Sequence, residues 1–390
     1  MTGLQYCSIP YDSAKLVLLH NFISDLGDLS ALKEDVGATR HLDFGKNAYA
    51  LYQWLLAPCF AAIENIESID RLIIVPDDLL SQLPFEALIR SAAPTVYSPT
   101  YYKELDYLLH RYQVSYSYSG TLLLENMKQM DALNKVVSKG ILAFAPSYNH
   151  ESLPTTRSTI QRGLRSKLED LPAATDEVRG LEALYKGTYI YGLEASESLY
   201  KKEASDYQII HLAMHGIFER GRPLASGLAF SENGDSLEDN FLYAYEISQM
   251  SSKVKLVVLS ACETGVGEWK RGEGLMSLAR SFMYSGVPSL LVSLWQVNDQ
   301  ATAVLMQNYY KNLALGFPKD KALQVAKQTY LKSAKGIAAH PALWAAFVQL
   351  GNVEPIEIKT KGLAWGYWAI GLLGLSLLLF LGLFFLKFKK

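Results

Sequence analysis

A cysteine and a histidine each stand at the end of a predicted strand. Cys262 closes an apolar, β-branched run at residues 257–262 (VVLSAC), and polar residues and glycines follow it. His215 closes a second such run, and Gly216 comes next. Ligands of open α/β sheets bind outside the carboxyl ends of the strands. If the two strands are parallel neighbours, we expect both side chains at one rim of the sheet.

A thiol beside an imidazole can carry nucleophilic catalysis. A free cysteine titrates near about pH 8.5, so little of it is thiolate at neutral pH unless a base or a cation lies beside it. His215 is the candidate base for Cys262. Gly216 has no Cβ, so its backbone N–H can approach a developing oxyanion, and the N–H of Cys262 is the natural second donor.

A structural role is the alternative for any cysteine, because free cysteines are among the most often buried residues. The strand-end position, the glycine-rich stretch that follows and the matching end at His215 favour catalysis for Cys262. Cys7 and Cys59 have no such neighbours, and we interpret them as structural. Three scattered cysteines without a CxxC pair indicate neither a disulfide framework nor a zinc knuckle, and they suit a reducing compartment.

His211 lies four residues before His215, which raises the question of a shared metal ion. On a strand the two residues would lie about 13 Å apart at about 3.3 Å per residue, too far for one ion with ligand distances of about 2.1 Å. A helical zinc site would need an HExxH motif, which is absent. We therefore predict that His211 is buried and hydrogen-bonded, and we predict neither a metal nor a cofactor.

A glycine-rich stretch follows the cysteine at residues 265–274 (GVGEWKRGEG). It has no GK[ST] sequence, so it is not a phosphate-binding loop. We interpret it as a flap beside the thiol that an upstream signal or a partner orders.

The composition is that of a globular chain with a sizeable core. Of 390 residues, 49% are hydrophobic, and 37 lysines and arginines nearly balance 39 aspartates and glutamates. The pI of about 6.4 gives no field that would attract nucleic acid, so nucleic-acid binding is not expected. The N-terminus lacks a basic region followed by an apolar one, so we predict no secretory signal and expect most of the chain in the cytoplasm.

Residues 362–386 contain no charged side chain and are rich in leucine and phenylalanine. At about 1.5 Å per residue, a helix of this length crosses a hydrocarbon layer of roughly 30 Å, and its apolar residues would favour insertion by about 4 to 8 kcal/mol. Aromatic residues lie near one end and lysines at the other. Lysines flank both ends, so charge does not set the orientation. We predict one transmembrane helix at the cell membrane; a buried core helix is the alternative.

Short β-branched runs alternate with helical stretches, the pattern of an α/β fold with a mostly parallel sheet. The expected strands are residues 15–19, 71–75, 140–145, 188–191, 208–213, 255–260 and 289–294, and the expected helices are residues 48–66, 122–137, 174–184, 274–284, 300–315 and 319–334. We divide the chain into an N-terminal part (1–118), a catalytic domain (119–352), a linker (353–361) and the transmembrane helix (362–386).

The chain resembles the CHAT family of caspase-like, clan CD cysteine peptidases. The segments that carry the resemblance include HLAMHG, PLASGLAF, LYAYEI, VVLSACETGVG, GEGLMSLARSFMYSGVPSLLVSLWQVND and HPALWAAFVQLG. The resemblance implies a caspase/hemoglobinase-like three-layer sandwich, with Cys262 as nucleophile and His215 as general base. It leaves open whether residues 1–118 form a pseudo-caspase subdomain.

Departures from the caspase pattern bear on specificity. The QAC[RQG]G box is absent, and residues 289–299 contain no arginine, so cleavage after aspartate is not expected. We expect a substrate to pair by β-addition with residues 289–294, taken as a sheet edge, and Trp295 to line a subsite. The substrate-binding candidates are Ser260, Glu263, Trp295 and Asp299, although Asp299 is equally placed to cap a helix.

These observations predict a membrane-tethered cysteine endopeptidase that acts on a protein substrate. Some members of the family act in bacterial defence, including as activators of pore-forming gasdermins, so a gasdermin-like protein is a candidate substrate. Two alternatives stay open: a catalytically silent adaptor at the membrane, and a small-molecule thiol hydrolase or acyltransferase with a deep closed pocket. The oligomeric state, the trigger and the P1 preference are left open.

Overall fold

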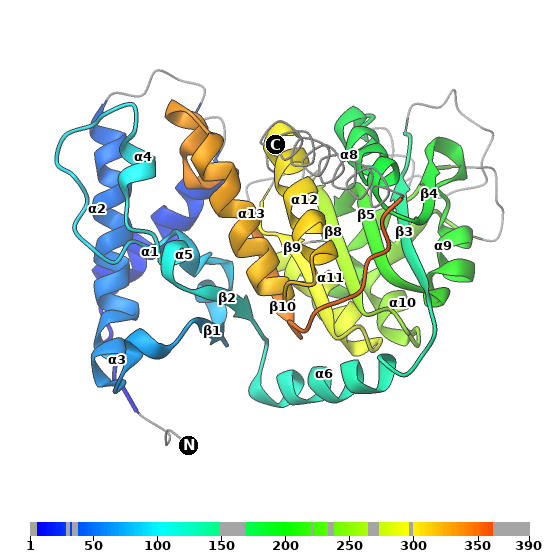
Figure 1. Ribbon diagram of the computed structural model, residues 1–390, viewed down its shortest axis with the longest axis horizontal. Helices are drawn as coiled ribbons and strands as arrows, with labels where there is room; N and C mark the ends of the chain where they lie inside the picture. Colours follow the sequence, from blue (N-terminus) through cyan, green and yellow to red (C-terminus); the bar gives the residue numbers. More distant parts are fainter. Residues whose placement is uncertain are drawn as a thin grey trace, which may run out of the picture.

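A mixed α/β sheet organises the chain in a computed structural model, which describes residues 6–28, 32, 38–148, 168–219, 221–232, 238–263, 273–295 and 299–361 (Figure 1). The strands follow one another across the sheet in the order β1-β2-β10-β9-β8-β5-β3-β4, and β6 and β7 extend it from β5. Their bounds are β1 Arg71–Ile74, β2 Gln113–Tyr116, β3 Lys139–Ala145, β4 Gly187–Tyr191, β5 Tyr207–Ile217, β6 Gly227–Ala229, β7 Phe241–Tyr243, β8 Leu256–Glu263, β9 Ser289–Ser293 and β10 Phe347–Gly351. Most neighbouring pairs are parallel, as the sequence predicts; the antiparallel pairs are β10 with β9, β5 with β6 and β6 with β7.

The central strands are buried along most of their length, which explains their continuous apolar sequences. Helices pack on the sheet, and α8, α12 and α13 lie side by side (Figure 1). The described helices are α1 Ser13–Gly27, α2 Ala38–Leu55, α3 Ala57–Ala62, α4 Tyr101–Glu104, α5 Leu108–Arg111, α6 Gly120–Leu133, α8 Pro172–Leu184, α9 Glu197–Glu203, α10 Ala244–Gln249, α11 Glu273–Tyr284, α12 Asp299–Ala314 and α13 Lys319–Ser333.

Side-chain contacts assign helices to both faces of the sheet. His211 of β5 points to one face, where its ring contacts Tyr310 of α12. Leu212, the next residue, therefore points to the other face. Phe144 of β3 is the register partner of Leu212, and it packs against Tyr200 of α9. The sheet thus lies between a layer that contains α12 and a layer that contains α9.

The N-terminal part joins the same sheet. β1 and β2 pair with each other, and β2 pairs with β10 from the far end of the chain. A buried ion pair between Glu86 and Lys327 of α13 is a second contact between the N-terminal part and the rest of the domain. Tyr116 donates a hydrogen bond to Glu86. The predicted boundary between residues 118 and 119 falls in the connection between β2 and α6, and it stays a prediction.

Two predictions about the N-terminal part are wrong. Residues 15–19, predicted as a strand, lie in α1, because the Asp12 carboxylate accepts hydrogen bonds from the N–H groups of Ala14 and Lys15 and so caps a helix. The helix predicted over residues 48–66 starts earlier and divides into α2 and α3 at Leu56, where Pro58 stands in the first turn of α3.

The prediction that residues 289–294 form a sheet edge is also wrong. β9 lies inside the sheet, with Leu290 opposite Val257 of β8 and opposite Leu350 of β10. Because both sides of β9 are paired with strands of this chain, a substrate cannot add to it by β-pairing. Sheet order depends on pairing between distant segments, and a single strand's sequence does not contain that information.

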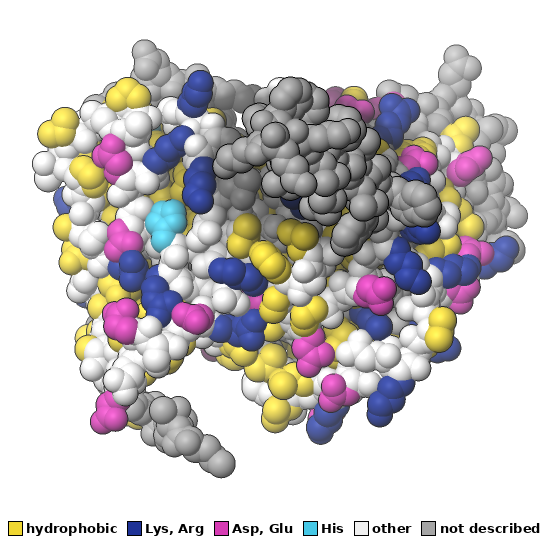
Figure 2. Space-filling model, in the orientation of Figure 1, with side chains coloured by type: hydrophobic (Ala, Val, Ile, Leu, Met, Phe, Trp, Pro, Cys, Tyr) yellow, Lys and Arg dark blue, Asp and Glu magenta, His cyan; other side chains and the backbone are white. Residues whose placement is uncertain are grey.

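The surface drawn in Figure 2 carries lysines, arginines and acidic side chains interspersed with one another. Within the described ranges, no helix combines the length and the apolar character that a membrane crossing requires. The predicted transmembrane helix, residues 362–386, and the predicted flap, residues 265–274 except 273 and 274, lie outside the described residues.

Candidate active site

The two predicted strand ends are neighbours. β5 and β8 run parallel, and their register places His215 opposite Cys262 and Gly216 opposite Glu263. Adjacent strands lie about 4.8 Å apart, so the backbones of His215 and Cys262 are in direct proximity. The structure describes Cys262 and Glu263 through the backbone only. The expectation that two parallel strands end side by side is confirmed.

The imidazole of His215 is held in one orientation. Its side chain is nearly buried, at 3% exposure, and Nε2 lies 2.7 Å from the carbonyl oxygen of Glu169. A carbonyl oxygen accepts only, so Nε2 carries the proton. In the neutral ring Nδ1 then has the lone pair, and among the described residues Nδ1 has no hydrogen-bond partner. The ring is therefore arranged to accept a proton at Nδ1.

Burial lowers the pKa of His215 below its usual value of 6.5, because a buried imidazolium loses its hydration. The carbonyl of Glu169 and the charges of Glu169 and Asp170 oppose this shift but do not overcome it. The neutral, proton-accepting form therefore predominates at pH 7.

Tyr148 forms a support for His215 that the sequence did not reveal. Its hydroxyl accepts a hydrogen bond from the backbone N–H of His215 at 3.1 Å and donates one to the carbonyl of Ala229 at 2.8 Å. The two rings are in contact, with centroids 4.6 Å apart. The backbone N–H of Tyr148 donates to the carboxylate of Asp170 at 2.6 Å. No local pattern marks Tyr148, which follows β3 in a polar stretch.

The packing around Gly216 leaves little room for a side chain. A Cβ added there would come within 2.7 Å of Cζ of Phe218, closer than non-bonded carbons approach. The backbone of Gly216 is also opposite Leu228 of β6. Its predicted part in an oxyanion hole, with the N–H of Cys262, stays a prediction.

A buried polar network lies beneath the strand ends. The Ser260 hydroxyl donates to Oε2 of Glu177 at 2.9 Å, and Oε1 of Glu177 lies 3.1 Å from Nε2 of His211. Nδ1 of His211 lies 3.0 Å from the hydroxyl of Tyr310. His211 is fully buried, so the prediction of a buried, hydrogen-bonded histidine is confirmed. Ser260, a predicted substrate-binding residue, is engaged with Glu177 of α8.

The other predicted site residues lie in different surroundings. Trp295 is 5% exposed, and its indole N–H donates to the carbonyl of Ala342 at 2.8 Å, so it offers a substrate little surface. Asp299 begins α12, and its side chain lies outside the described part of the structure. Burial, followed by the neighbouring Cys7 thiol, raises the pKa of Cys59 to about 11, which makes it a poor nucleophile at neutral pH.

Residues 45–352 match the family of the CHAT domain. The chain belongs to the CHAT domain family. It is also similar to tetratricopeptide repeat protein 28 of Mus musculus and of Homo sapiens, at 31% and 30% identity over 116 residues. That segment is 30% of this chain and 5% of each of those proteins, so the chain spans a small part of these curated relatives.

Two solved structures resemble the CHAT chain loosely. One is the Arg-specific cysteine proteinase gingipain R (RGPB), with a TM-score of 0.42, 11% identity, and coverage of 90% of this chain and 80% of that chain. The other is the Saccharomyces cerevisiae separase–securin complex, with a TM-score of 0.38, 11% identity, and coverage of 64% and 15%. Nothing about the reaction follows from likenesses this weak.

Within the described part of the CHAT chain, one acidic cluster has the geometry of a cation site. Carboxylate oxygens of Glu197, Glu238 and Glu246 surround Nζ of Lys201 at 2.7, 2.7 and 2.8 Å. Burial raises the pKa of Glu197 to about 7, although Lys201 opposes the shift. The ammonium of Lys201 already occupies the centre, so we assign no metal to the cluster.

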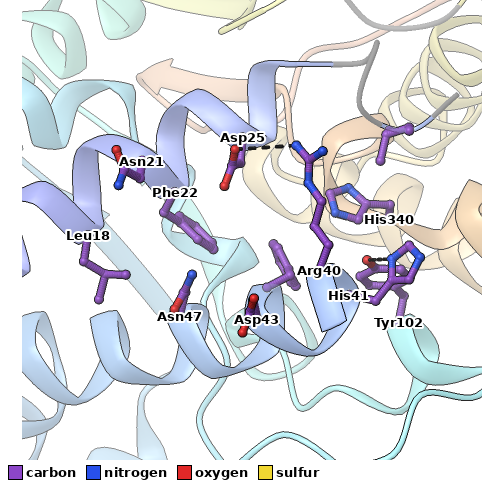
Figure 3. A pocket seen from close by; sticks show the side chains of 12 residues that line it. Leu18, Asn21, Phe22, Asp25, Arg40, His41, Asp43, Asn47, Tyr102 and His340 are labelled. Atoms are coloured by element: carbon purple, nitrogen blue, oxygen red, sulfur yellow. Dashed lines mark hydrogen bonds and ion pairs between the residues drawn. The ribbon is translucent and has the colours of Figure 1, made fainter. Parts of the chain in front are cut away.

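A separate cavity of about 380 Å³ lies in the N-terminal part, between α1, α2 and the segment after α13 (Figure 3). Arg40 faces Asp25 at 3.6 Å across its mouth, and Nδ1 of His41 lies 2.7 Å from the hydroxyl of Tyr102. His340 lies beside Arg40 and His41 in the lining (Figure 3); burial first, then the neighbouring His41 and Arg40, lowers its pKa to about 3. No sequence pattern indicates this cavity.

Proposed function

We propose that this CHAT-family chain is a membrane-tethered cysteine endopeptidase in which Cys262 is the nucleophile and His215 the general base. The observation that carries the proposal is the register of β5 and β8, which sets these two residues opposite each other. Support also comes from the fixed orientation of the His215 ring, whose Nδ1 is the proton-accepting atom.

The proposed reaction has two halves. Nδ1 of His215 takes the proton from Sγ of Cys262, and the sulfur attacks the peptide carbonyl. The N–H groups of Gly216 and Cys262 stabilise the oxyanion. The C–N bond then breaks, and the proton on Nδ1 passes to the departing amine, leaving a thioester. Next, Nδ1 takes a proton from water, the hydroxide attacks the thioester, and the acid product leaves as the proton returns to sulfur.

Of the four predicted substrate-binding residues, Glu263 and Asp299 remain candidates. Ser260 and Trp295 are engaged within the protein, as described above. Glu263 is the last described residue of β8, and Asp299 begins α12, the helix that follows β9. Glu263 thus ends β8 and Asp299 follows β9, and both strands end at the same edge of the sheet as His215. Acidic residues there would favour a basic side chain in the substrate.

The proposal includes the cellular location of the reaction and the kind of substrate. The apolar segment at residues 362–386 supports anchoring at the cell membrane, with the CHAT domain on the cytoplasmic side. The family resemblance supports a protein substrate in bacterial defence, for which a gasdermin-like pore former is the candidate.

The experiment is to incubate the full chain with a candidate gasdermin and to follow its cleavage. The Cys262→Ala and His215→Ala variants should leave the substrate intact, whereas Cys59→Ala, the matched cysteine control, should cleave like the parent. Cleavage by Cys262→Ala at the parental rate would reject the proposed nucleophile. Absence of cleavage by the parent, together with no labelling of Cys262 by a thiol-directed peptide probe, would favour the silent adaptor.

A further inference from the structure

The segment after β10 is docked on the domain. It was predicted as a linker, yet Ile356 and Ile358 are only 3% and 8% exposed. Residues 352–361 run from the end of β10 past the starts of the central strands toward β4, visible as the orange-red trace in Figure 1. Hydrogen bonds join this segment to residues at or next to the starts of three strands. The bonds are Asn352 N–H to Pro288 O before β9, Gln208 Nε2 of β5 to Glu357 O, and Lys186 N–H, before β4, to Lys359 O. Lys361 N–H also donates to Leu184 O.

These contacts place the chain's exit at the amino edge of the sheet, which we define as the edge where β3, β4, β5 and β8 begin. Lys361 is the last described residue, and its N–H is bonded to the carbonyl of Leu184 at 2.8 Å. The uncharged, apolar residues 362–386 begin immediately after it. In the sequence, no linker therefore separates the docked segment from the apolar segment.

The surface at this edge has the chemistry of a membrane contact. Val136, Val137 and Leu315 are 40%, 100% and 65% exposed, and residues 136, 137, 313, 314 and 316 border a groove of about 620 Å³. Lysines lie on or beside the same surface: Lys135, Lys186, Lys255, Lys359 and Lys361. The acidic side chains at this edge are Glu354 and Glu357 of the docked segment, and Glu203 and Asp206, which pair with Lys139. Exposed aliphatic residues among lysines are typical of surfaces that rest on anionic lipid headgroups.

We propose that this amino-edge surface rests on an anionic lipid bilayer and holds the catalytic edge away from it. The proposal depends on the membrane anchoring in the proposed function and not on the peptidase activity. His215 is eight residues beyond Tyr207 on β5 (215 − 207), which at about 3.3 Å per residue is about 26 Å. The peptide bonds that this site reaches then lie about 25 Å or more from the headgroups. Its substrates are segments that project into the cytoplasm, and bonds next to the membrane are out of reach.

The test measures the depth of two fluorescent labels on the full chain in vesicles. In a background with Cys7, Cys59 and Cys262 changed to serine, one label is attached through Val137→Cys at the amino edge and another through Leu224→Cys. Leu224 is 58% exposed and lies beyond the carboxyl end of β5. With a lipid-borne quencher in phosphatidylcholine–phosphatidylserine vesicles, quenching at position 137 should exceed that at 224 by at least about threefold. Equal quenching, or stronger quenching at 224, would overturn the proposal, as would a chain that the vesicles do not retain.

Charge reversal supplies a second measurement. Lys186→Glu with Lys359→Glu should lower the quenching at position 137 in phosphatidylserine vesicles and change it little in phosphatidylcholine alone. The matched control is Lys15→Glu with Lys46→Glu on α1 and α2, which should leave the quenching unchanged. Equal effects of the two pairs would count against a specific surface. Because Cys262 is already replaced in these proteins, failure of the peptidase assignment would leave both results interpretable.

Discussion

Nε2 of His215 lies 2.7 Å from the backbone carbonyl oxygen of Glu169, and this contact sets the chemistry of the ring. A backbone carbonyl cannot change its protonation, so the contact fixes the proton on Nε2 more firmly than a titrating side chain would. It leaves the lone pair on Nδ1, the atom of the proposed base, while burial keeps the imidazole neutral. Orientation and protonation state are thus controlled by separate features of the fold.

The pH dependence of activity follows from the pKa of His215. Its pKa is lowered, so the base becomes protonated only below the usual value of 6.5. The acidic limb of kcat/KM should therefore have its midpoint below pH 6.5, and activity should fall as the pH falls through it. Initial rates across pH 4 to 8 test this. A midpoint at or above pH 6.5 would contradict the account.

Removing the Tyr148 hydroxyl should slow catalysis. Tyr148→Phe leaves the N–H of His215 and the carbonyl of Ala229 without this partner, which costs about 1 to 3 kcal/mol and lets the histidine shift. We expect kcat to fall about tenfold with little change in KM. The same substitution at Tyr309, whose hydroxyl bonds Gln349, should affect stability and not kcat. Equal kcat values for the two variants would reject a positioning role for Tyr148.

Glu177 should contribute strongly to stability. Its carboxylate accepts from Ser260 and faces His211, and all three groups lie in or near the core. Glu177→Leu would leave the Ser260 hydroxyl without its acceptor and remove the carboxylate beside His211, so it should lower the free energy of unfolding by about 2 to 4 kcal/mol in urea titrations. Glu125→Leu on α6 removes an exposed carboxylate and should cost under about 0.5 kcal/mol. Similar losses for both variants would show that the buried network adds little.

Acid should destabilise the cavity of the N-terminal part through His340. Its pKa of about 3 in the folded chain is below the unfolded value of 6.5, so the unfolded chain binds more protons between these values. Stability is therefore lost as pH falls from about 6.5 to about 3. His340→Gln should reduce the difference in unfolding free energy between pH 7 and pH 4, and His20→Gln, at an exposed position of α1, should not. An unchanged difference in His340→Gln would contradict this.

The sequence predicted the central strands from local signals and placed Cys262 and His215 near the ends of two of them, whereas their catalytic roles stay predictions. β3, β8 and β9 are mostly apolar runs, and β4 is a short β-branched and aromatic run at the end of the sheet; each was placed within a few residues of its observed bounds. The pairing of β5 with β8 followed from one assumption, that the two strands are parallel neighbours, which the register confirms.

Other features depend on contacts between distant segments. The interior place of β9 requires β10, a strand that the sequence analysis did not identify. The support of His215 comes from a backbone carbonyl at Glu169 and a hydroxyl at Tyr148, 46 and 67 residues away along the chain. A carbonyl is present at every residue, so no side-chain pattern could have identified this one. The error in α1 is different in kind, because an apolar run of five residues suits a strand or a helix equally.

The most direct test of the central claim is the rate at which Cys262 is alkylated by iodoacetamide at pH 7, read by mass spectrometry beside Cys59 in the same chain. If His215 withdraws the thiol proton, His215→Ala should slow the reaction of Cys262 at least about tenfold, whereas Cys59, whose pKa is raised to about 11, should react slowly and equally in both proteins. Equal rates for the two cysteines, or an unchanged Cys262 rate in His215→Ala, would contradict the account.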